Sequence, residues 1–154
     1  MNNTVELSPK LLKEAMGVGL KRVLTAIEAD AWNTTGEPNN TPESLVEHID
    51  GAMAEAAYCQ FRGVQWIPHD KYFKGADVGV KTQVRSTRWP TGRLRLKETD
   101  NDDDYFVLVR QITTFHIVGW IKGAAGKRVA ATEAYINPDA PMLLVPNDCL
   151  RSFK

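Results

Sequence analysis

Two kinds of apolar spacing divide this chain, and the change between them limits the folds that it can adopt. Up to about residue 61, apolar residues recur at spacings of three and four, which is typical of helices buried on one face. From Gln65 onward, β-branched and aromatic residues gather in short runs separated by turn residues. The chain therefore predicts helices first and a sheet afterwards, within the 154 residues of one ordinary domain.

Two helices are predicted in the N-terminal part. The first begins after Ser8, a good N-cap residue, and contains Gly17 and Gly19, which weaken a helix unless a neighbour packs closely against them. The second begins after Thr41 and ends before Gly63. The expected core stripes are Leu12, Met16, Leu20, Val23 and Ile27 in the first helix, and Leu45, Ile49, Met53 and Ala56 in the second.

A separate face of the second helix carries small residues around one carboxylate. His48, Gly51, Ala52, Glu55 and Cys59 are related by helical spacings of three and four (48 to 51 and 52, then 55 and 59), so they share one side of the helix. Small side chains leave room for another group to approach Glu55 closely. The ordinary alternative is that Glu55 is an exposed carboxylate on a helix surface.

The second part of the chain predicts strands joined by short links. Because most of these links have the length of hairpin connections, antiparallel pairing is expected. The predicted fold is a single α/β domain with a mixed, mainly antiparallel sheet flanked by helices. In it, residues 1–40 form an N-terminal helix and loop, and residues 41–154 form the core. The expected strands are residues 78–87, 93–97, 105–111 and 114–121, with short strands at 134–136 and 142–145 and a last turn over 147–153.

The charges of the chain are balanced overall but segregated along it. There are 19 Lys and Arg residues and 19 Asp and Glu residues, yet residues 78–97 hold six cations and no acid, and residues 98–104 hold five acids and no cation. A basic hairpin capped by an acidic turn is therefore expected. Cations clustered beside an aromatic residue suit phosphate contact and base stacking, whereas a solvated strand face is the ordinary alternative. The candidate nucleic-acid contacts are Lys81, Arg88, Trp89, Arg93 and Arg95.

Three segments hold the residues on which chemistry would depend: Glu55 in the second helix, Asp77 before Val78 and Gly79, and the run Gln83-Val84-Arg85. This order resembles the PD-(D/E)XK nuclease superfamily, in which a helical Glu precedes an Asp at a strand and then an acid-x-Lys motif. Residues 105–109 and 115–121 are similar to the remaining core strands of small phage-encoded members. The resemblance covers roughly residues 44–150 and rests on a short, degenerate motif.

The resemblance implies a restriction-endonuclease-like fold and a metal-dependent DNA nuclease that uses Mg²⁺ or Mn²⁺. Asp77 would be the central metal ligand, assisted by Glu55 and by the amide oxygen of Gln83, a weaker ligand than a carboxylate. Arg85 stands where the family has Lys, and because it stays protonated it would bind phosphate rather than act as a base. Lys81 is an alternative to Arg85 as the cation of the site.

The departures from the family pattern at Gln83 and Arg85 leave other functions open. One is a catalytically inactive nuclease-fold protein that binds nucleic acid or a protein partner. Another is a purely structural or interaction protein. For Asp77 the ordinary alternative is a turn residue.

The proposed ligands meet only under a geometric condition. In a straight strand, Asp77 and Gln83 would lie about 20 Å apart and could not share an ion. Gly79 is the residue at which the chain can bend to bring them together. With Val84 in the core, the alternation of a strand places Gln83 and Arg85 together on the opposite face.

The sequence also indicates a compartment and partners. No apolar run approaches the roughly 18 residues that span a bilayer, and the N-terminus lacks a signal-peptide pattern. The two cysteines, Cys59 and Cys149, are too few for a disulfide framework. A cytoplasmic location is expected (the host cytoplasm if the chain is phage-encoded), with DNA as the partner, no membrane association, and a homodimer left open.

Overall fold

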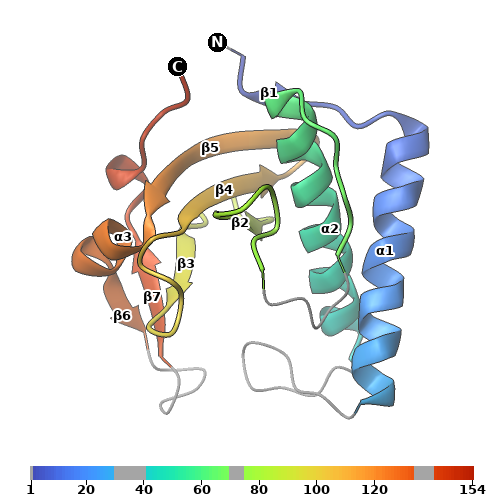
Figure 1. Cartoon of the computed structure of the whole chain (residues 1–154), viewed down its shortest axis with the longest axis horizontal. Coiled ribbons are helices and arrows are strands. Elements are labelled where there is room, and N and C mark those ends of the chain that lie inside the picture. Colours follow the sequence, from blue (N-terminus) through green and yellow to red (C-terminus); the bar gives the residue numbers. More distant parts are fainter. Residues whose placement is uncertain (1, 30–40, 70–74, 134–140) are drawn as a thin grey trace.

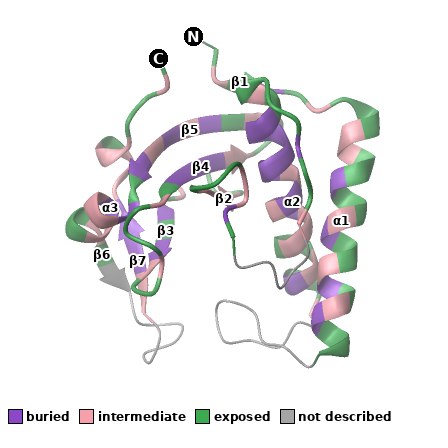
Figure 2. Cartoon of the chain, in the orientation of Figure 1, coloured by how far each residue is buried: buried purple, intermediate pink, exposed green. Residues whose placement is uncertain are grey.

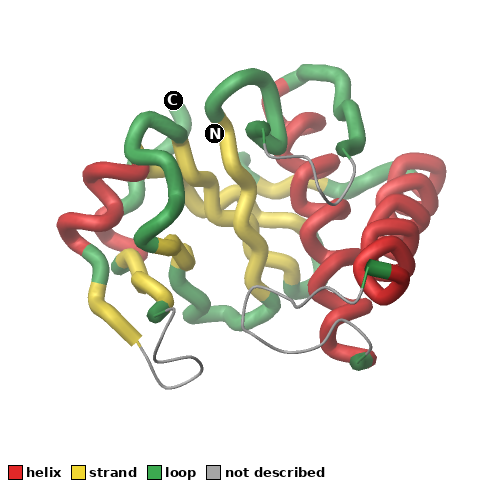
Figure 3. The backbone as a smooth tube through the Cα atoms, turned by 60° about the horizontal axis from the view of Figure 1, so that its bottom comes forward, coloured by secondary structure: helices red, strands yellow, loops and turns green. Residues whose placement is uncertain are grey.

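The structure is a computed structural model, and it describes residues 2–29, 41–69, 75–133 and 141–154. Two long helices, α1 (Pro9–Glu28) and α2 (Pro42–Arg62), lie side by side, and α2 separates α1 from the strands (Figure 1). Figure 3 shows the strands lying between this helix pair and the short helix α3 (Gly123–Val129). The strand expected at residues 134–136 lies outside the described residues, and the domain division after residue 40 stays a prediction.

Both long helices begin where their capping residues predict. The Ser8 hydroxyl oxygen accepts a hydrogen bond from the N–H of Leu11, and that of Thr41 accepts one from Ser44, each at 3.2 Å. At the end of α2, Gly63 adopts the left-handed conformation with φ of +64°. These caps satisfy backbone groups that would otherwise lack partners.

The predicted core stripe of α1 is largely wrong. Met16, Leu20 and Ile27 are 45%, 45% and 46% exposed, whereas Val23 is buried as expected. The face that packs on α2 is built instead from small residues, because the two helices approach very closely: a Cβ atom on Gly19 would collide with the backbone of Ile49. The buried residues of α1 are Ala15, Gly19, Val23 and Ala26.

α2 is buried on two sides, and Figure 2 shows its buried residues along much of its length. Ala52 and Ala56 belong to the apolar cluster shared with α1. Ala54 and Ala57 belong to a second cluster, shared with the sheet. Glu55 therefore lies in the most buried stretch of α2, residues 54–59.

The first sheet has the strand order β1-β5-β4-β2. Within it β2 pairs in parallel with β4, whereas β4 with β5 and β5 with β1 are antiparallel. Strand β2 is therefore an edge strand, and one row of its backbone groups faces away from the sheet. The strands are β1 (Thr4–Val5), β2 (Thr82–Thr87), β4 (Tyr105–Gln111) and β5 (Phe115–Lys122).

The second sheet has the order β3-β7-β6, and both of its pairs are antiparallel. Two predicted hairpins are therefore wrong: β3 pairs with neither β2 nor β4, although short links join it to both. The chain leaves the first sheet after β2 and crosses to its other face before it returns as β4. The strands are β3 (Leu94–Lys97), β6 (Ala131–Glu133) and β7 (Met142–Val145), followed by a short 3₁₀ helix (Asn147–Cys149).

Alternating side chains of the first sheet build two apolar clusters. Val84, Val107 and Val109 face α2, and Phe106 and Leu108 face the second sheet. Within the described residues, four of the five strand pairs are antiparallel. The predicted α/β class, with a mixed and mainly antiparallel sheet flanked by helices, is confirmed at this level.

Candidate functional site

Asp77 lies at the free edge of β2. The chain turns back tightly at Gly79, whose φ is +62°, just before β2 begins. This turn brings Asp77 alongside the strand, where its Oδ2 accepts a hydrogen bond of 2.7 Å from the N–H of Val84. The predicted bend at Gly79 is thus confirmed, and it shortens the expected strand 78–87 to Thr82–Thr87.

The carboxyl group of Asp77 is held where ionisation is unfavourable. Burial, and after it the negative charge of Glu55, raise its pKa to about 6, although the Val84 N–H and the Arg85 guanidinium favour the ionised form. The charge of Glu55 therefore acts on Asp77 from the neighbouring helix α2. A carboxyl group with a raised pKa beside specific charge partners is typical of functional sites.

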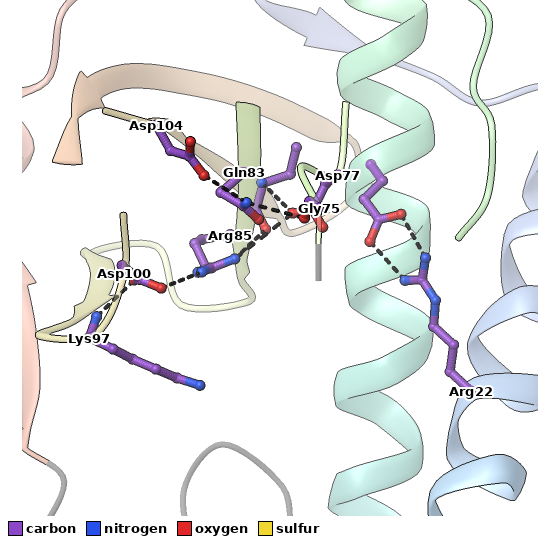
Figure 4. Close-up of polar contacts among 10 residues, drawn as sticks. Arg22, Gly75, Asp77, Gln83, Arg85, Lys97, Asp100 and Asp104 are labelled. Carbon is purple, nitrogen blue, oxygen red and sulfur yellow. Dashed lines mark hydrogen bonds and ion pairs between the residues drawn. The ribbon is translucent and has the colours of Figure 1, made fainter. Parts of the chain in front are cut away.

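Glu55 is buried in α2 and is bound by Arg22 of α1. Arg22 donates from Nη1 to Oε1 at 2.7 Å and from Nη2 to Oε2 at 3.0 Å, so both carboxylate oxygens are engaged (Figure 4). The Nε of Arg22 donates to the backbone carbonyl of His69 at 3.0 Å. The predicted close approach to Glu55 is therefore confirmed, and the alternative of an exposed carboxylate is wrong, since its side chain is only 7% exposed.

Gln83 and Arg85 lie on the same face of β2, as strand alternation predicts. Val84 between them belongs to the apolar cluster under α2, so its two neighbours point to the opposite side. On that side the guanidinium carbon of Arg85 lies 5.3 Å from the centre of the Phe106 ring, within the range of a cation–π contact.

Arg85 lies between two carboxylates (Figure 4). Its Nη2 is 3.3 Å from Oδ1 of Asp100, and its Nη1 is 3.9 Å from Oδ2 of Asp77. The other oxygen of Asp100 accepts a hydrogen bond of 2.8 Å from the N–H of Lys97. The pKa of the half-buried Lys97 is lowered by burial and then by the charge of Arg85. Lys97 therefore shares Asp100 with Arg85, through its backbone N–H.

Gln83 is placed beside the loop that carries Asp77. Its Nε2 donates to Oδ2 of Asp104 at 3.0 Å, and a longer contact of 3.4 Å joins it to the carbonyl oxygen of Gly75. A carboxylate at position 83 would face Asp104 without a proton to donate. The amide suits this position because it supplies that donor.

The sequence reasoning missed the partners of the predicted site residues. Arg22 lies 33 positions before Glu55, and the small residues of α2 predict an approach to Glu55 without identifying what makes it. The acids that bind Arg85 and Gln83 come from the run that was expected to form a simple turn. Long-range pairs of this kind leave no spacing signal. The missed residues are Arg22, Lys97, Asp100 and Asp104.

The predicted basic hairpin is not formed, because β2 and β3 belong to different sheets. Residues 88–93 make a turn in which Gly92 N–H donates to the carbonyl of Trp89 at 3.0 Å. Arg88 binds both oxygens of Asp50, at 2.5 and 2.7 Å, so its charge is already compensated. Trp89 is 72% exposed. The other candidate contacts with an exposed side chain are Lys81, Arg93 and Arg95.

The predicted metal ligands fit a hard divalent cation in their chemistry. Asp77, Glu55 and the amide oxygen of Gln83 are oxygen donors, and a cation would relieve the repulsion that contributes to the raised pKa of Asp77. Arg22 opposes this fit, since it engages both oxygens of Glu55. In the described part of the chain, no three His, Cys, Asp or Glu side chains are grouped so as to hold a metal ion.

Comparison with known proteins, by sequence and by structure, gives no match that would indicate a function. No protein-family model matches the chain, and no curated protein or solved structure gives a match. Over the residues that the structure describes, no helix combines the length and the apolar character needed to cross a membrane. The residues around Asp77 are therefore the basis on which a function can be inferred.

Proposed function

We propose that this protein is a metal-dependent DNA nuclease of the PD-(D/E)XK type, with a restriction-endonuclease-like core. The observation that carries the proposal is Asp77 at the free edge of the first sheet, 3.9 Å from Arg85 and with its pKa raised to about 6 by burial and by the charge of Glu55. Two neighbouring carboxylates in a partly buried place are unfavourable for folding. Such an arrangement is expected at a site that binds a cation or transfers a proton.

Mg²⁺ or Mn²⁺ is the cofactor that suits these donors. Asp77 would hold it at the sheet edge, with Glu55 and the amide oxygen of Gln83 as the further protein ligands. When bound, such an ion polarises a phosphate oxygen and activates a water molecule for attack on phosphorus. The ion would favour the ionised form of Asp77 in particular, because burial and the charge of Glu55 raise the pKa of that carboxyl group to about 6.

Arg85 is suited to stabilising negative charge rather than to transferring a proton. An arginine side chain is not a proton acceptor in proteins. The guanidinium of Arg85 lies 3.9 Å from Asp77, so it would contact a phosphate bound beside Asp77. Lys97 differs, because its pKa is lowered by burial and by Arg85. The backbone N–H of Lys97 binds Asp100, the carboxylate that also pairs with Arg85, so Lys97 belongs to the surroundings of the proposed site.

Exposed residues between positions 81 and 95 would contact the DNA. Trp89, which is 72% exposed, offers a surface on which a base can stack. Arg93, Arg95 and Lys81 would contact phosphates, and Arg88 would contribute less because it binds Asp50. These contacts suit single- or double-stranded DNA, and they do not require a homodimer.

A cytoplasmic location, in the host if the chain is phage-encoded, belongs to the same proposal. Cys59 and Cys149 are both free thiols. Free thiols suit a reducing compartment, where disulfides are rare.

Cleavage assays on supercoiled plasmid and on single-stranded DNA test the proposed activity. With Mg²⁺ or Mn²⁺ the wild-type protein should cleave at least one of them, and Asp77→Asn should reduce the rate by about 100-fold or more. Asp148→Asn is the matched control, because Asp148 is exposed in the short 3₁₀ helix. This control should keep wild-type activity. Cleavage that survives Asp77→Asn would reject the proposed site.

A non-catalytic protein that binds DNA or a protein partner is the second candidate. It is favoured by the contact between Arg22 and both oxygens of Glu55, and by the amide of Gln83 where the family has an acid. DNA binding by the wild-type protein without cleavage, over a range of Mg²⁺ and Mn²⁺ concentrations, would support this candidate over the nuclease.

A further inference from the structure

Arg22 binds the carboxylate that the proposed metal site would use. Two of its nitrogens donate to the two oxygens of Glu55 at 2.7 and 3.0 Å, and its third donates to the carbonyl of His69 at 3.0 Å. The Arg22 and Glu55 side chains are 13% and 7% exposed. This is a bidentate, charge-assisted contact between two buried groups rather than a surface ion pair.

A buried carboxylate such as that of Glu55 needs a positive partner. Without one, its charge would be desolvated and uncompensated, which is strongly unfavourable. Asp77 increases this need, because the two carboxylates repel each other. In this structure the partner of Glu55 is Arg22.

Two cations are not favoured at the same carboxylate. A guanidinium bound in bidentate fashion takes one lone pair on each oxygen and places a full positive charge next to the proposed metal position. Repulsion between that charge and a divalent ion is strong where water is largely excluded. Entry of a metal ion therefore favours a shift of Arg22 away from Glu55.

We propose that Arg22 is a competing cation of the metal site, and that it sets the concentration of Mg²⁺ or Mn²⁺ at which the site fills. This inference rests on the proposed function, since it concerns the same carboxylates. Arg22 acts through Glu55 and is in this sense a positioning residue.

The surroundings of Arg22 allow it to shift without leaving the site. Its Nε contact to the carbonyl of His69 does not depend on Glu55 and can persist when the other two hydrogen bonds are lost. Its charge also favours the ionised form of Asp77. The guanidinium therefore has a second acceptor and a second carboxylate close to its present position.

Metal binding by Arg22→Met tests this competition. Calorimetric titration with Mn²⁺ alone, at about pH 8, which is above the pKa of about 6 of Asp77, should give a Kd about tenfold or more below that of the wild type. Met keeps the length and packing of the side chain but removes its charge. Arg22→Lys keeps the charge without the bidentate contact and should give an intermediate Kd.

A neighbouring cation provides the matched control. Lys21 lies next to Arg22 on α1 and is exposed, so Lys21→Met should leave the Kd for Mn²⁺ at its wild-type value. Melting temperatures give a second readout. Arg22→Met should melt below the wild type without metal and should gain more than the wild type when Mn²⁺ is added.

Two results would overturn the role of Arg22 while leaving the metal site intact. One is an unchanged Kd with a melting temperature lowered equally with and without Mn²⁺, which would make Arg22 only a structural partner of Glu55. The other is a weaker Kd, which would mean that Arg22 holds Glu55 in place for the metal. If Arg22→Met does not fold by circular dichroism, Arg22→Lys supplies the same comparison.

A different set of Mn²⁺-binding results would reject the proposed metal site itself. If neither the wild type nor the Arg22 variants bind Mn²⁺, both the proposed metal site and the proposed role of Arg22 are rejected. If all of them bind with one affinity and Asp77→Ala abolishes binding, the metal site stands and only the competition is rejected.

Discussion

Asp77 is a carboxyl group whose ionisation opposes folding. Its pKa is about 6 in the folded protein, mainly because it is buried, against an ordinary value of 3.8. Between these two pH values the folded protein keeps a proton that the unfolded chain has released. The contribution of Asp77 to stability therefore falls as the pH rises through this window, and above it the full cost remains.

Asp77→Asn should reveal that cost. The variant removes the titration but keeps an oxygen to accept the hydrogen bond from Val84. At about pH 4 the two proteins should be similarly stable, and at about pH 7 the variant should be more stable by about 2 kcal/mol. This figure allows for solvent screening, since the Asp77 side chain is 26% exposed.

Urea unfolding in the presence of EDTA, at both pH values, measures this difference. A stability gap that is the same at both would contradict the raised pKa of Asp77. Asp148→Asn, on an exposed residue, should show no such change between the two conditions. Under the proposed function, Asp77→Asn would gain stability and lose activity, as expected when a site is maintained at the expense of folding.

At the scale of elements, the close contact between α1 and α2 depends on one glycine. A Cβ atom on Gly19 would collide with the backbone of Ile49, whereas one on Gly17 would meet no atom within 4 Å. The two positions therefore form a matched pair within one helix. The close approach at Gly19 also helps to place Arg22, one turn further along α1, within reach of Glu55.

Alanine at these two positions should have opposite effects on the free energy of unfolding. Gly17→Ala should raise it by about 0.5 to 1 kcal/mol, because alanine favours the helix. Gly19→Ala should lower it by about 1 to 3 kcal/mol, because the helices would have to separate. Chemical denaturation measures both. Stabilisation by Gly19→Ala would mean that α1 and α2 are further apart than described.

Local signals predicted the helix ends and the turn before β2, whereas contacts distant in sequence could not be predicted. Ser8, Thr41 and Gly79 act within a few residues of themselves, so their roles are visible in the sequence. The buried face of α1 is different: large apolar residues predict a stripe, but a close helix contact selects small ones. The partner of Glu55 depends on that same contact.

The strand partners also depended on information outside each segment. A short link between β2 and β3 fits a hairpin, yet it equally permits a crossing to the other face of the sheet. The apolar residues Leu94 and Leu96 of β3 are buried against that face. Burial there fixed the pairing of β3 with β7, which lies almost fifty residues away in sequence.

At the scale of the molecule, the proposed chemistry and the proposed base-stacking residue Trp89 lie at opposite ends of β2. Asp77 is beside the first half of the strand, and Trp89 lies just beyond its end. From Gln83 to Trp89 an extended chain spans roughly 20 Å. One DNA strand has a phosphate about every 3.4 Å. A substrate reaching from one end to the other would therefore cover roughly six nucleotides.

Two arginines of the same basic segment should contribute differently to such an interface. Arg95 is exposed on β3, whereas Arg88 is bound to both oxygens of Asp50. If Arg95 contacts one phosphate, Arg95→Ala should reduce the slope of log K against log salt by about 0.9 for duplex DNA or about 0.7 for a single strand. Titrations at several salt concentrations measure this slope.

Compared with Arg95→Ala, Arg88→Ala should reduce the slope of log K against log salt less and should lower the free energy of unfolding more. Its guanidinium already has a counter-charge, so it releases fewer ions from DNA, and its removal leaves Asp50, which is 10% exposed, without this partner. The expected loss in the free energy of unfolding is up to about 1 kcal/mol, because Arg88 itself is 57% exposed. Equal reductions of the salt slope by the two variants would mean that DNA takes Arg88 from Asp50. In that case, the ion pair would be part of the binding surface rather than a structural contact that competes with it.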